Sequence, residues 1–358
     1  MKIYQQFALF CFMLASGMAC AQQSKPAYDE YDPPSTLKVP EHLVNRAKFP
    51  FIDVHNHQWP MSKSSLQDLV KEMDKMNMRV MVNLSGGSGN SLKKMLDLIK
   101  ENYPDRFLVF ANIDFDGIGE AGWSERAAKQ LAEDVKNGAA GLKIFKNLGF
   151  SVMDNRGKRV PVDDPRLDAI WAKAGALKIP VLIHTADPKS FWDPMDGKNE
   201  RLMELQTHPQ RQRGPNNPAP WDTLIEEQHR MFAKHPQTTF IAAHFGWYPN
   251  DLDKLDELLT RLPNVLVEMG AVIAELGRQP KRARAFFEKY QDRILFGKDS
   301  WVPSEYATYF RVLETDDEYF PYHKRYHAFW RMYGMGLPDA ILKKVYAENA
   351  MRLFPMIR

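Results

Sequence analysis

The chain has 358 residues, of which 44% are hydrophobic and 26% are charged, a composition that excludes an intrinsically disordered protein. Its 48 lysines and arginines against 45 aspartates and glutamates give a net charge of +3, so no broad electrostatic attraction to nucleic acid or to a membrane surface is expected. The two cysteines, Cys11 and Cys20, both stand near the N-terminus. A metal site in the rest of the chain must therefore use histidine and carboxylate ligands.

The first 21 residues have the pattern of a signal peptide. Lys2 precedes an apolar stretch at 7–18, which is too short to span a bilayer but typical of the centre of an export signal. Residues 19–21, Ala-Cys-Ala, fit the small-x-small pattern of a cleavage site. The alternative is a degenerate lipoprotein box, which would place a lipid anchor on Cys20. We therefore expect an exported protein, periplasmic, extracellular or lipid-anchored, with no transmembrane span.

Two further segments follow the signal. Residues 22–49 are rich in proline, tyrosine and charge, and we expect a linker that leads into an N-terminal arm. Residues 50–358 are predicted to form one domain, in which short β-rich runs alternate with amphipathic helical stretches. Eight such runs can be counted, at 51–57, 79–85, 106–113, 139–145, 180–185, 238–245, 264–270 and 293–299.

The eight runs are continuously apolar, which is typical of parallel strands that are buried on both faces. Eight strand–helix units predict an α/β fold of the (β/α)₈ type, a TIM-like barrel. The alternative, an open doubly wound sheet, is disfavoured because no GxGxxG motif follows the first run. Two long insertions, at 186–221 and 300–336, are expected to shape the active face and to determine specificity.

Polar residues occur where these runs end. His55 and His57 end the first run, His184 the fifth, His244 the sixth and Asp299 the eighth. Barrel enzymes place their chemistry at the carboxyl ends of the strands. Three imidazoles and one carboxylate can converge there on a divalent cation, with a position left open for water.

The chain resembles the amidohydrolase superfamily, specifically the branch called amidohydrolase family 2. The resemblance rests on DVHNH at 53–57, LIHTAD at 182–187, FIAAHFG at 240–246, LFGKDS at 295–300 and VYAENAMRLF at 345–354. It implies a distorted barrel with a metal at its mouth. Carried over residue by residue, it assigns the metal ligands to His55, His57, His184 and Asp299, and it gives catalytic roles to His244 and Asp299.

The implied cofactor is one divalent metal ion. A set of three histidines and one aspartate suits Zn²⁺ best, and Mn²⁺ or Fe²⁺ remain alternatives. Lys143, in the fourth run, has two interpretations. In some members of the superfamily a carboxylated lysine on this strand bridges two metals, whereas here Lys143 is more readily interpreted as binding a substrate carboxylate or an internal acid directly.

Five other residues are candidate substrate ligands or supports of the site: Asp187, Glu268, Arg278, Lys298 and Trp247. Lys298 stands where the resembled family usually has a small residue, so it either binds an acidic substrate or turns outward. Asp187 either contacts substrate or caps the insertion that follows it.

The leading functional hypothesis is a metal-dependent hydrolase that uses activated water on a small polar or cyclic substrate, such as an amide or a lactone. The alternative on the same metal is a nonoxidative decarboxylase or a hydratase. A third hypothesis, from another class, is a carbohydrate- or solute-binding barrel without catalysis. The expected partner is a small-molecule substrate and not a nucleic acid, and assembly into a homo-oligomer is left open.

Overall fold

The computed structural model describes residues 25, 27, 30–327 and 330–357. The expected signal peptide and Cys20 lie outside these residues. The chain divides into two compact units, Met1–Ser35 and Thr36–Arg358, and everything below concerns the second. Within the described residues, no helix combines the length and the apolar character needed to cross a bilayer.

Eight parallel strands form the centre of this unit, and they are paired in chain order from β1 to β8. Their bounds are β1 Phe51–Asn56, β2 Met78–Asn83, β3 Phe107–Asn112, β4 Gly141–Ile144, β5 Val181–Ile183, β6 Phe240–Ala242, β7 Val265–Glu268 and β8 Ile294–Leu295. The backbone closes the ring between β8 and β1, where Val54 N donates to Phe296 O at 3.0 Å and Asp299 N donates to His55 O at 2.6 Å. The predicted (β/α)₈ barrel is confirmed.

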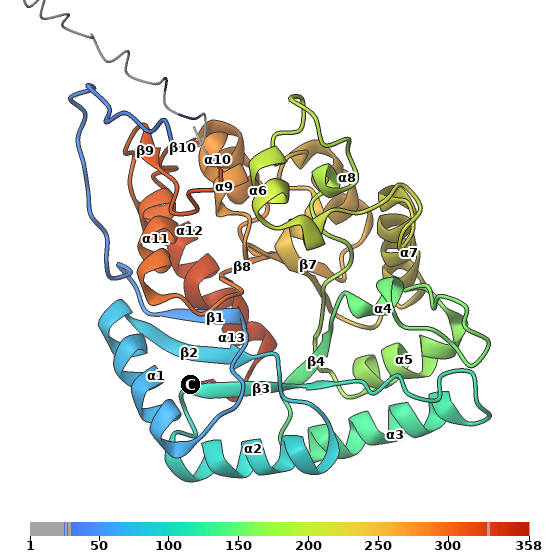
Figure 1. Ribbon diagram of the computed structural model, residues 1–358. Coiled ribbons are helices and arrows are strands. Elements are labelled where there is room, and N and C mark those ends of the chain that lie inside the picture. The colour runs from blue at the N-terminus through green and yellow to red at the C-terminus, as the bar shows by residue number, and fades with distance from the viewer. Residues whose placement is uncertain (1–24, 26, 28–29, 328–329, 358) are drawn as a thin grey trace, which may run out of the picture. The chain divides into compact units, whose positions relative to one another are not determined.

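Amphipathic helices lie outside the strands, and Figure 1 shows α1, α2 and α3 running beside β1 to β4. In α1 the buried residues Leu66, Leu69, Met73 and Met76 recur at three- and four-residue spacing, so one face packs on the sheet. The helices of the first half are α1 Lys63–Met76, α2 Gly89–Asn102, α3 Trp123–Lys136, α4 Asn147–Phe150 and α5 Asp168–Ala176. Those of the second half are α6 Leu202–Thr207, α7 Trp221–Lys234, α8 Leu252–Arg261, α9 Ile273–Arg278, α10 Pro280–Lys289, α11 Tyr306–Glu314, α12 Asp339–Lys343 and α13 Asn349–Leu353.

Alternate strand residues fill the inside of the barrel. These inward residues form a cluster that the C-terminal segment joins through Ala350, Phe354 and Ile357. The rings of Phe110 on β3 and Phe354 are 5.8 Å apart, edge to face. Apolar packing therefore occupies one end of the barrel, and the polar residues gather at the other end.

Gly141 on β4 is expected to tolerate no side chain, because an added Cβ would lie 2.4 Å from the nearest ring atom of Phe110. We expect Gly141→Ala to lower the free energy of unfolding by about 1–3 kcal/mol through overpacking. Gly197→Ala is the matched control, since a Cβ added there would meet no atom within 4 Å and its backbone is not left-handed. Urea unfolding of both variants checks the prediction, and equal stabilities would contradict it.

All eight strands are shorter than the runs in the sequence suggest, and His57 lies just after β1 and not on it. The fifth, sixth and eighth runs were predicted at 180–185, 238–245 and 293–299, but pairing ends at Ile183, Ala242 and Leu295. Beyond these points the chain turns out of the barrel, so His184, His244 and Asp299 lie in the loops just after the strands and not on them. The loops aim these side chains across the mouth of the barrel.

The insertions contain short elements. The segment 186–221 carries α6, and the segment 300–336 carries α11 and a small antiparallel pair, β9 Phe320–Pro321 with β10 Arg331–Met332. In the arm before β1, Ala47 N donates to Met76 O at 3.1 Å, and His42 N donates to the buried Asp317 carboxylate at 2.7 Å. From Thr36 onward the predicted arm therefore belongs to the barrel unit.

Candidate metal centre and active site

Three predicted ligands meet at the carboxyl end of the barrel. His55 Nε2 lies 3.5 Å and His57 Nε2 lies 3.6 Å from Asp299 Oδ1. These separations are too long for a good hydrogen bond. Two ligands on one tetrahedral ion, each at its usual bond length, stand about 3.4 Å apart. The spacing therefore fits a shared metal ion.

The rings of both histidines are fixed through Nδ1. His55 Nδ1 is 2.9 Å from the buried Glu268 carboxylate, and His57 Nδ1 is 2.9 Å from Ser85 Oγ. A histidine that donates from Nδ1 keeps a lone pair on Nε2, which is the form that binds a metal. Consistently, His55 Nε2 is buried and has no hydrogen-bond partner among the described residues.

His184 and His244, beside the cluster, are also held through hydrogen bonds to their ring nitrogens. His244 Nδ1 lies 2.7 Å from Gly270 O, and because a carbonyl only accepts, the ring must donate from Nδ1. His244 Nε2 then faces His184 Nδ1 at 3.3 Å. His184 Nε2 is buried and makes no hydrogen bond in the described part of the chain, its nearest carboxylate contact being Asp187 Oδ1 at 3.9 Å, so it is free to bind a metal. His184 is nevertheless not part of the compact cluster, which consists of His55, His57 and Asp299, so its role as a ligand remains a prediction.

The loop after β6 holds His244 in an unusual conformation. Four successive residues, His244 to Trp247, have φ between 54° and 59°, and three of them are not glycine. Asp299 also has a positive φ, of 81°. Such conformations cost about 1–3 kcal/mol each for ordinary residues and persist where the surroundings impose them. Their concentration around His244 and Asp299 marks this end of the barrel as the functional one.

The Glu268 carboxylate accepts hydrogen bonds from several residues around the candidate metal centre. Its Oε1 accepts from His55 Nδ1 and from His244 N at 2.7 Å, and its Oε2 accepts from Gly270 N at 2.7 Å. The residue is fully buried. Glu268 is therefore placed to orient His55 and the His244 loop, and not to contact a substrate.

The electrostatics favour the metal-binding forms of these groups. Burial lowers the pKa of His57 to about 4, and burial with the nearby Lys143 lowers the pKa of His55 well below its usual value. Burial would raise the pKa of Asp299, but the neighbouring His55 and His244 hold it below its usual value. At neutral pH the His55 and His57 imidazoles are neutral and the Asp299 carboxylate is charged. The donor set thus fits one divalent ion.

Lys143 lies beside this cluster. Burial lowers its pKa to about 8, although Asp299 and Glu268 act in the opposite direction. Its Nζ is buried and has no hydrogen-bond partner among the described residues. A buried ammonium without a hydrogen-bond partner therefore lies beside the candidate metal centre, outside the residues that line the cavity.

The remaining candidates have other partners. Asp187 pairs with Lys146 at 2.6 Å and with Arg213 at 2.6 Å, and Lys298 pairs with Glu305. Trp247 packs on the His244 ring, with centroids 4.5 Å apart. Arg278 does not line the cavity next to the cluster, and it pairs instead with Glu200 at 3.0 Å.

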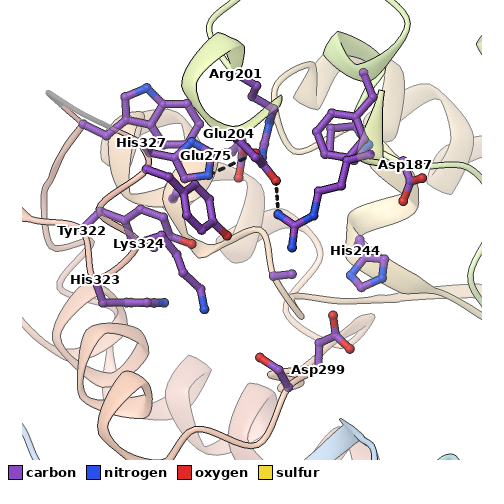
Figure 2. Close-up of a pocket in the computed structure, with 18 of the residues that line it drawn as sticks. Asp187, Arg201, Glu204, His244, Glu275, Asp299, Tyr322, His323, Lys324 and His327 are labelled. Carbon is purple, nitrogen blue, oxygen red and sulfur yellow. Dashed lines mark hydrogen bonds and ion pairs between the residues drawn. The ribbon is translucent and has the colours of Figure 1, made fainter. Parts of the chain in front are cut away.

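A cavity of about 280 Å³ opens above the cluster, and His184, His244, Trp247 and Asp299 form its floor. Most of its wall comes from the two insertions. Sequence reasoning missed seven charged wall residues: Lys146, Arg201, Glu204, Arg211, Glu275, Glu305 and Lys324. Figure 2 shows Arg201, Glu204 and Glu275 above the floor, and Lys324 on the side opposite His244.

His229 and His235 belong to a different part of the barrel, in α7 and at its end. His235 Nε2 pairs with Asp168 at 3.0 Å, whereas His229 Nε2 is buried without a partner in the described chain. Burial lowers the pKa of His229 from 6.5 to about 4.

This buried histidine predicts a loss of stability in acid. Between pH 6.5 and pH 4 the unfolded chain binds a proton at His229 that the folded chain does not. Its contribution to the free energy of unfolding therefore falls with pH, by at most about 1.4 kcal/mol per unit. We expect His229→Gln to reduce the loss of stability between pH 7 and pH 5. Urea titrations at both pH values check this, and an unchanged difference would refute it.

The fold and the site together define a (β/α)₈ barrel with a candidate metal centre at the carboxyl ends of its strands. The sequence model of the amidohydrolase 2 family, described as Amidohydrolase, matches residues 52–356. The chain therefore belongs to this family and is an enzyme. A search of curated proteins gives no significant match.

Solved structures with similar folds include two decarboxylases. A dihydroxybenzoic acid decarboxylase from Polaromonas sp. JS666, with bound manganese and the inhibitor 2-nitroresorcinol, has a TM-score of 0.54 at 16% identity and covers 87% of this chain and 98% of its own. A 2,6-dihydroxybenzoate decarboxylase in complex with 2,6-dihydroxybenzoate has a TM-score of 0.53 at 17% identity, with coverages of 86% and 99%. A TIM-barrel protein from Bordetella bronchiseptica has a TM-score of 0.52 at 16% identity, with coverages of 86% and 99%. At these identities the likeness is one of fold.

Proposed function

We propose that this enzyme is a metal-dependent hydrolase of a small polar or cyclic carbonyl compound, such as an amide or a lactone. One observation carries the proposal. His55, His57 and His184 each have Nδ1 in a hydrogen bond, and the Nε2 atoms of His55 and His184 are buried without a partner among the described residues. Nε2 lone pairs beside the Asp299 carboxylate are the kind of ligand set that holds a catalytic metal.

The metal-binding residues in this proposal are His55, His57, Asp299 and His184. A bound divalent ion would polarise the substrate carbonyl and lower the pKa of water. Asp299 accepts a proton from the attacking water with its free carboxylate oxygen. Asp299 can then pass that proton to the leaving group. His244, held by Gly270 O at 2.7 Å, uses Nε2 to accept from His184 Nδ1 at 3.3 Å and so orients this ligand beside the substrate. Lys143 donates a hydrogen bond to the substrate oxygen on which negative charge develops.

Nonoxidative decarboxylation is the second candidate, and the unpartnered Lys143 favours it because a buried ammonium suits a substrate carboxylate. Both reactions would use the same residues. They differ in their products: hydrolysis adds an oxygen from solvent, whereas decarboxylation releases carbon dioxide.

The deciding experiment is a substrate screen on the purified, metal-analysed enzyme in ¹⁸O-labelled water. The panel contains lactones, amides and hydroxylated carboxylic acids. Incorporation of one labelled oxygen into a product, lost on chelation and regained with metal, supports the hydrolase. Release of carbon dioxide without labelled product selects the decarboxylase, and turnover that survives complete metal removal overturns both.

We propose Zn²⁺ as the resident ion, at one ion per chain, because neutral imidazoles and one carboxylate suit it. Elemental analysis of the purified protein tests this directly. About one zinc per chain is expected. Manganese or iron in place of zinc would contradict the proposed identity of the metal. A ratio near two metal ions per chain would favour a dinuclear site that involves Lys143.

We further propose that the protein is exported, on the strength of the signal-like residues 1–21. Fractionation of expressing cells, with a Cys20→Ser variant, tests this proposal and separates the two forms of export. Processed protein in the soluble exported fraction indicates cleavage, and membrane association lost in Cys20→Ser indicates a lipid anchor. Unprocessed protein in the cytoplasm would refute export.

A further inference from the structure

One part of the cavity wall carries more positive than negative charge. Lys324 Nζ lies 2.6 Å from Glu305 Oε1, and Lys298 Nζ contacts the other oxygen of the same carboxylate. The Asp53 carboxylate also acts on Lys298, but it is fully buried and does not line the cavity. At the cavity face, the one Glu305 carboxylate is therefore shared by two ammonium groups. The adjacent His323 adds no charge at neutral pH, because burial lowers its pKa to about 4. Positive charge therefore exceeds negative charge at the cavity face of this group, Lys298, Glu305 and Lys324, which we call the Glu305 corner.

Of the two lysines at the Glu305 corner, Lys324 is the one that a ligand in the cavity can reach. Its side chain is 28% exposed, whereas that of Lys298 is 2% exposed. Figure 2 shows the Lys324 chain extending into the cavity from the wall opposite His244, with Asp299 below it. A ligand anchored on Lys324 would thus extend toward the candidate metal centre.

A second corner also has two cations on one carboxylate, since Asp187 pairs with both Lys146 and Arg213. Lys146 is 39% exposed, so water screens its charge more than that of Lys324. The Asp187 corner therefore offers a weaker site for an anion and a natural comparison.

Glu275 supplies an acceptor to the same cavity. One of its oxygens contacts the buried Arg201, and the other, Oε2, is buried with no partner in the described part of the chain. Glu275 is 5% exposed and lines the cavity. A buried carboxylate oxygen without a hydrogen bond is costly, and a hydroxyl group of a ligand would satisfy it.

We propose that the enzyme binds a small carboxylate that carries hydroxyl groups, with the carboxylate on Lys324 and a hydroxyl donating to Glu275 Oε2. The proposal names the substrate class of the proposed hydrolase, and it rests on that function only in placing the reacting carbonyl at the Asp299 end. The two contacts recognise different groups. An acid without hydroxyls and a polyol without a carboxylate should each bind more weakly than a molecule with both.

Calorimetric titration of the full chain, as purified, tests the charge contact. Gluconate is the probe, and sorbitol is the matched polyol without a carboxylate. Lys324→Gln leaves Glu305 paired with Lys298, so the variant should fold, and its melting temperature verifies this. We expect it to bind gluconate about tenfold more weakly and sorbitol unchanged, since a hydrogen bond to a charged group is worth about that factor.

Lys146→Gln is the control, because it removes another exposed cation of the cavity wall while Asp187 keeps Arg213. We expect less than about a threefold change in its affinity for gluconate, because its charge is the more screened of the two. Equal losses in the two variants would show a general effect of cavity charge and overturn the Lys324 site. Equal binding of gluconate and sorbitol to the unmodified protein would overturn it as well.

Glu275→Gln tests the hydroxyl contact, with hexanoate as an acid that lacks hydroxyls. The unmodified protein should prefer gluconate over hexanoate, and the variant should lose most of that preference, because the amide nitrogen cannot accept. A preference that persists in the variant would overturn the role of Glu275. These titrations need no turnover, so they can fail while the proposed hydrolysis holds, and they can succeed while it fails.

Discussion

His55→Ala is expected to remove the metal and the activity together. The substitution deletes a buried Nε2 that has no other described partner and leaves the Glu268 carboxylate without its histidine. We expect bound metal to fall from about one ion per chain to less than about a tenth, and turnover to fall at least about 100-fold. Elemental analysis and a rate measurement on the same preparation check both numbers.

Two further variants make this result specific. Asp299→Asn keeps the size of the side chain but weakens the ligand and removes the proton acceptor, so it should lower turnover more than metal content. His235→Ala removes a histidine that pairs with Asp168 away from the site, and it should retain metal. Full metal in His55→Ala, or equal metal loss in His235→Ala, would refute the assignment of the centre.

Gly297→Ala is expected to damage the same centre without replacing a ligand. An added Cβ would lie 2.2 Å from Glu268 Oε2 and 3.0 Å from the Cβ of His55. The Glu268 carboxylate would have to move, and its donors at His55, His244 and Gly270 would lose their acceptor. We expect a loss of about 2–4 kcal/mol in the free energy of unfolding, from overpacking and unpaired buried donors. Metal affinity should fall about 10- to 100-fold, as for other supports of metal ligands.

Chemical unfolding and metal competition titrations measure the two effects of Gly297→Ala. Gly197→Ala, which meets no atom within 4 Å, serves as the control. A loss of stability with unchanged metal affinity would show that Glu268 does not orient His55. No loss of either kind would show that the carboxylate has room to shift.

The strands of the barrel and the neighbourhood of the site could be predicted from sequence because both depend on local pattern. A buried parallel strand requires a continuous apolar run, and the polar residue that ends it must emerge at the carboxyl edge. His55 and Asp299 stand at opposite ends of the barrel sequence, yet this rule alone predicts that they lie at the same end of the barrel. The resemblance to the amidohydrolase family then supplied their roles, and the match over residues 52–356 confirms that family.

The cavity wall could not be predicted in this way. Arg201, Glu275 and Lys324 come from three different segments of the chain, and their contacts depend on how the insertions pack. The role of Glu268 was hidden for another reason. A carboxylate near a strand end is compatible with binding a substrate, and only the bonds from His55 and His244 show that it orients other residues.

The seam that closes the barrel has a consequence for its dynamics. The bond from Asp299 N to His55 O joins the last strand region to the first, and the side chains of these two residues belong to the candidate metal centre. A metal ion bound by both side chains would link β1 to the segment after β8. It would stabilise only the form in which the barrel is closed between these strands. Exchange of the amide hydrogens of Val54 and Asp299 with solvent should therefore slow when metal is bound, while amides on the far side of the ring keep their rates. Without the ion, we expect local opening of the barrel to begin between β8 and β1.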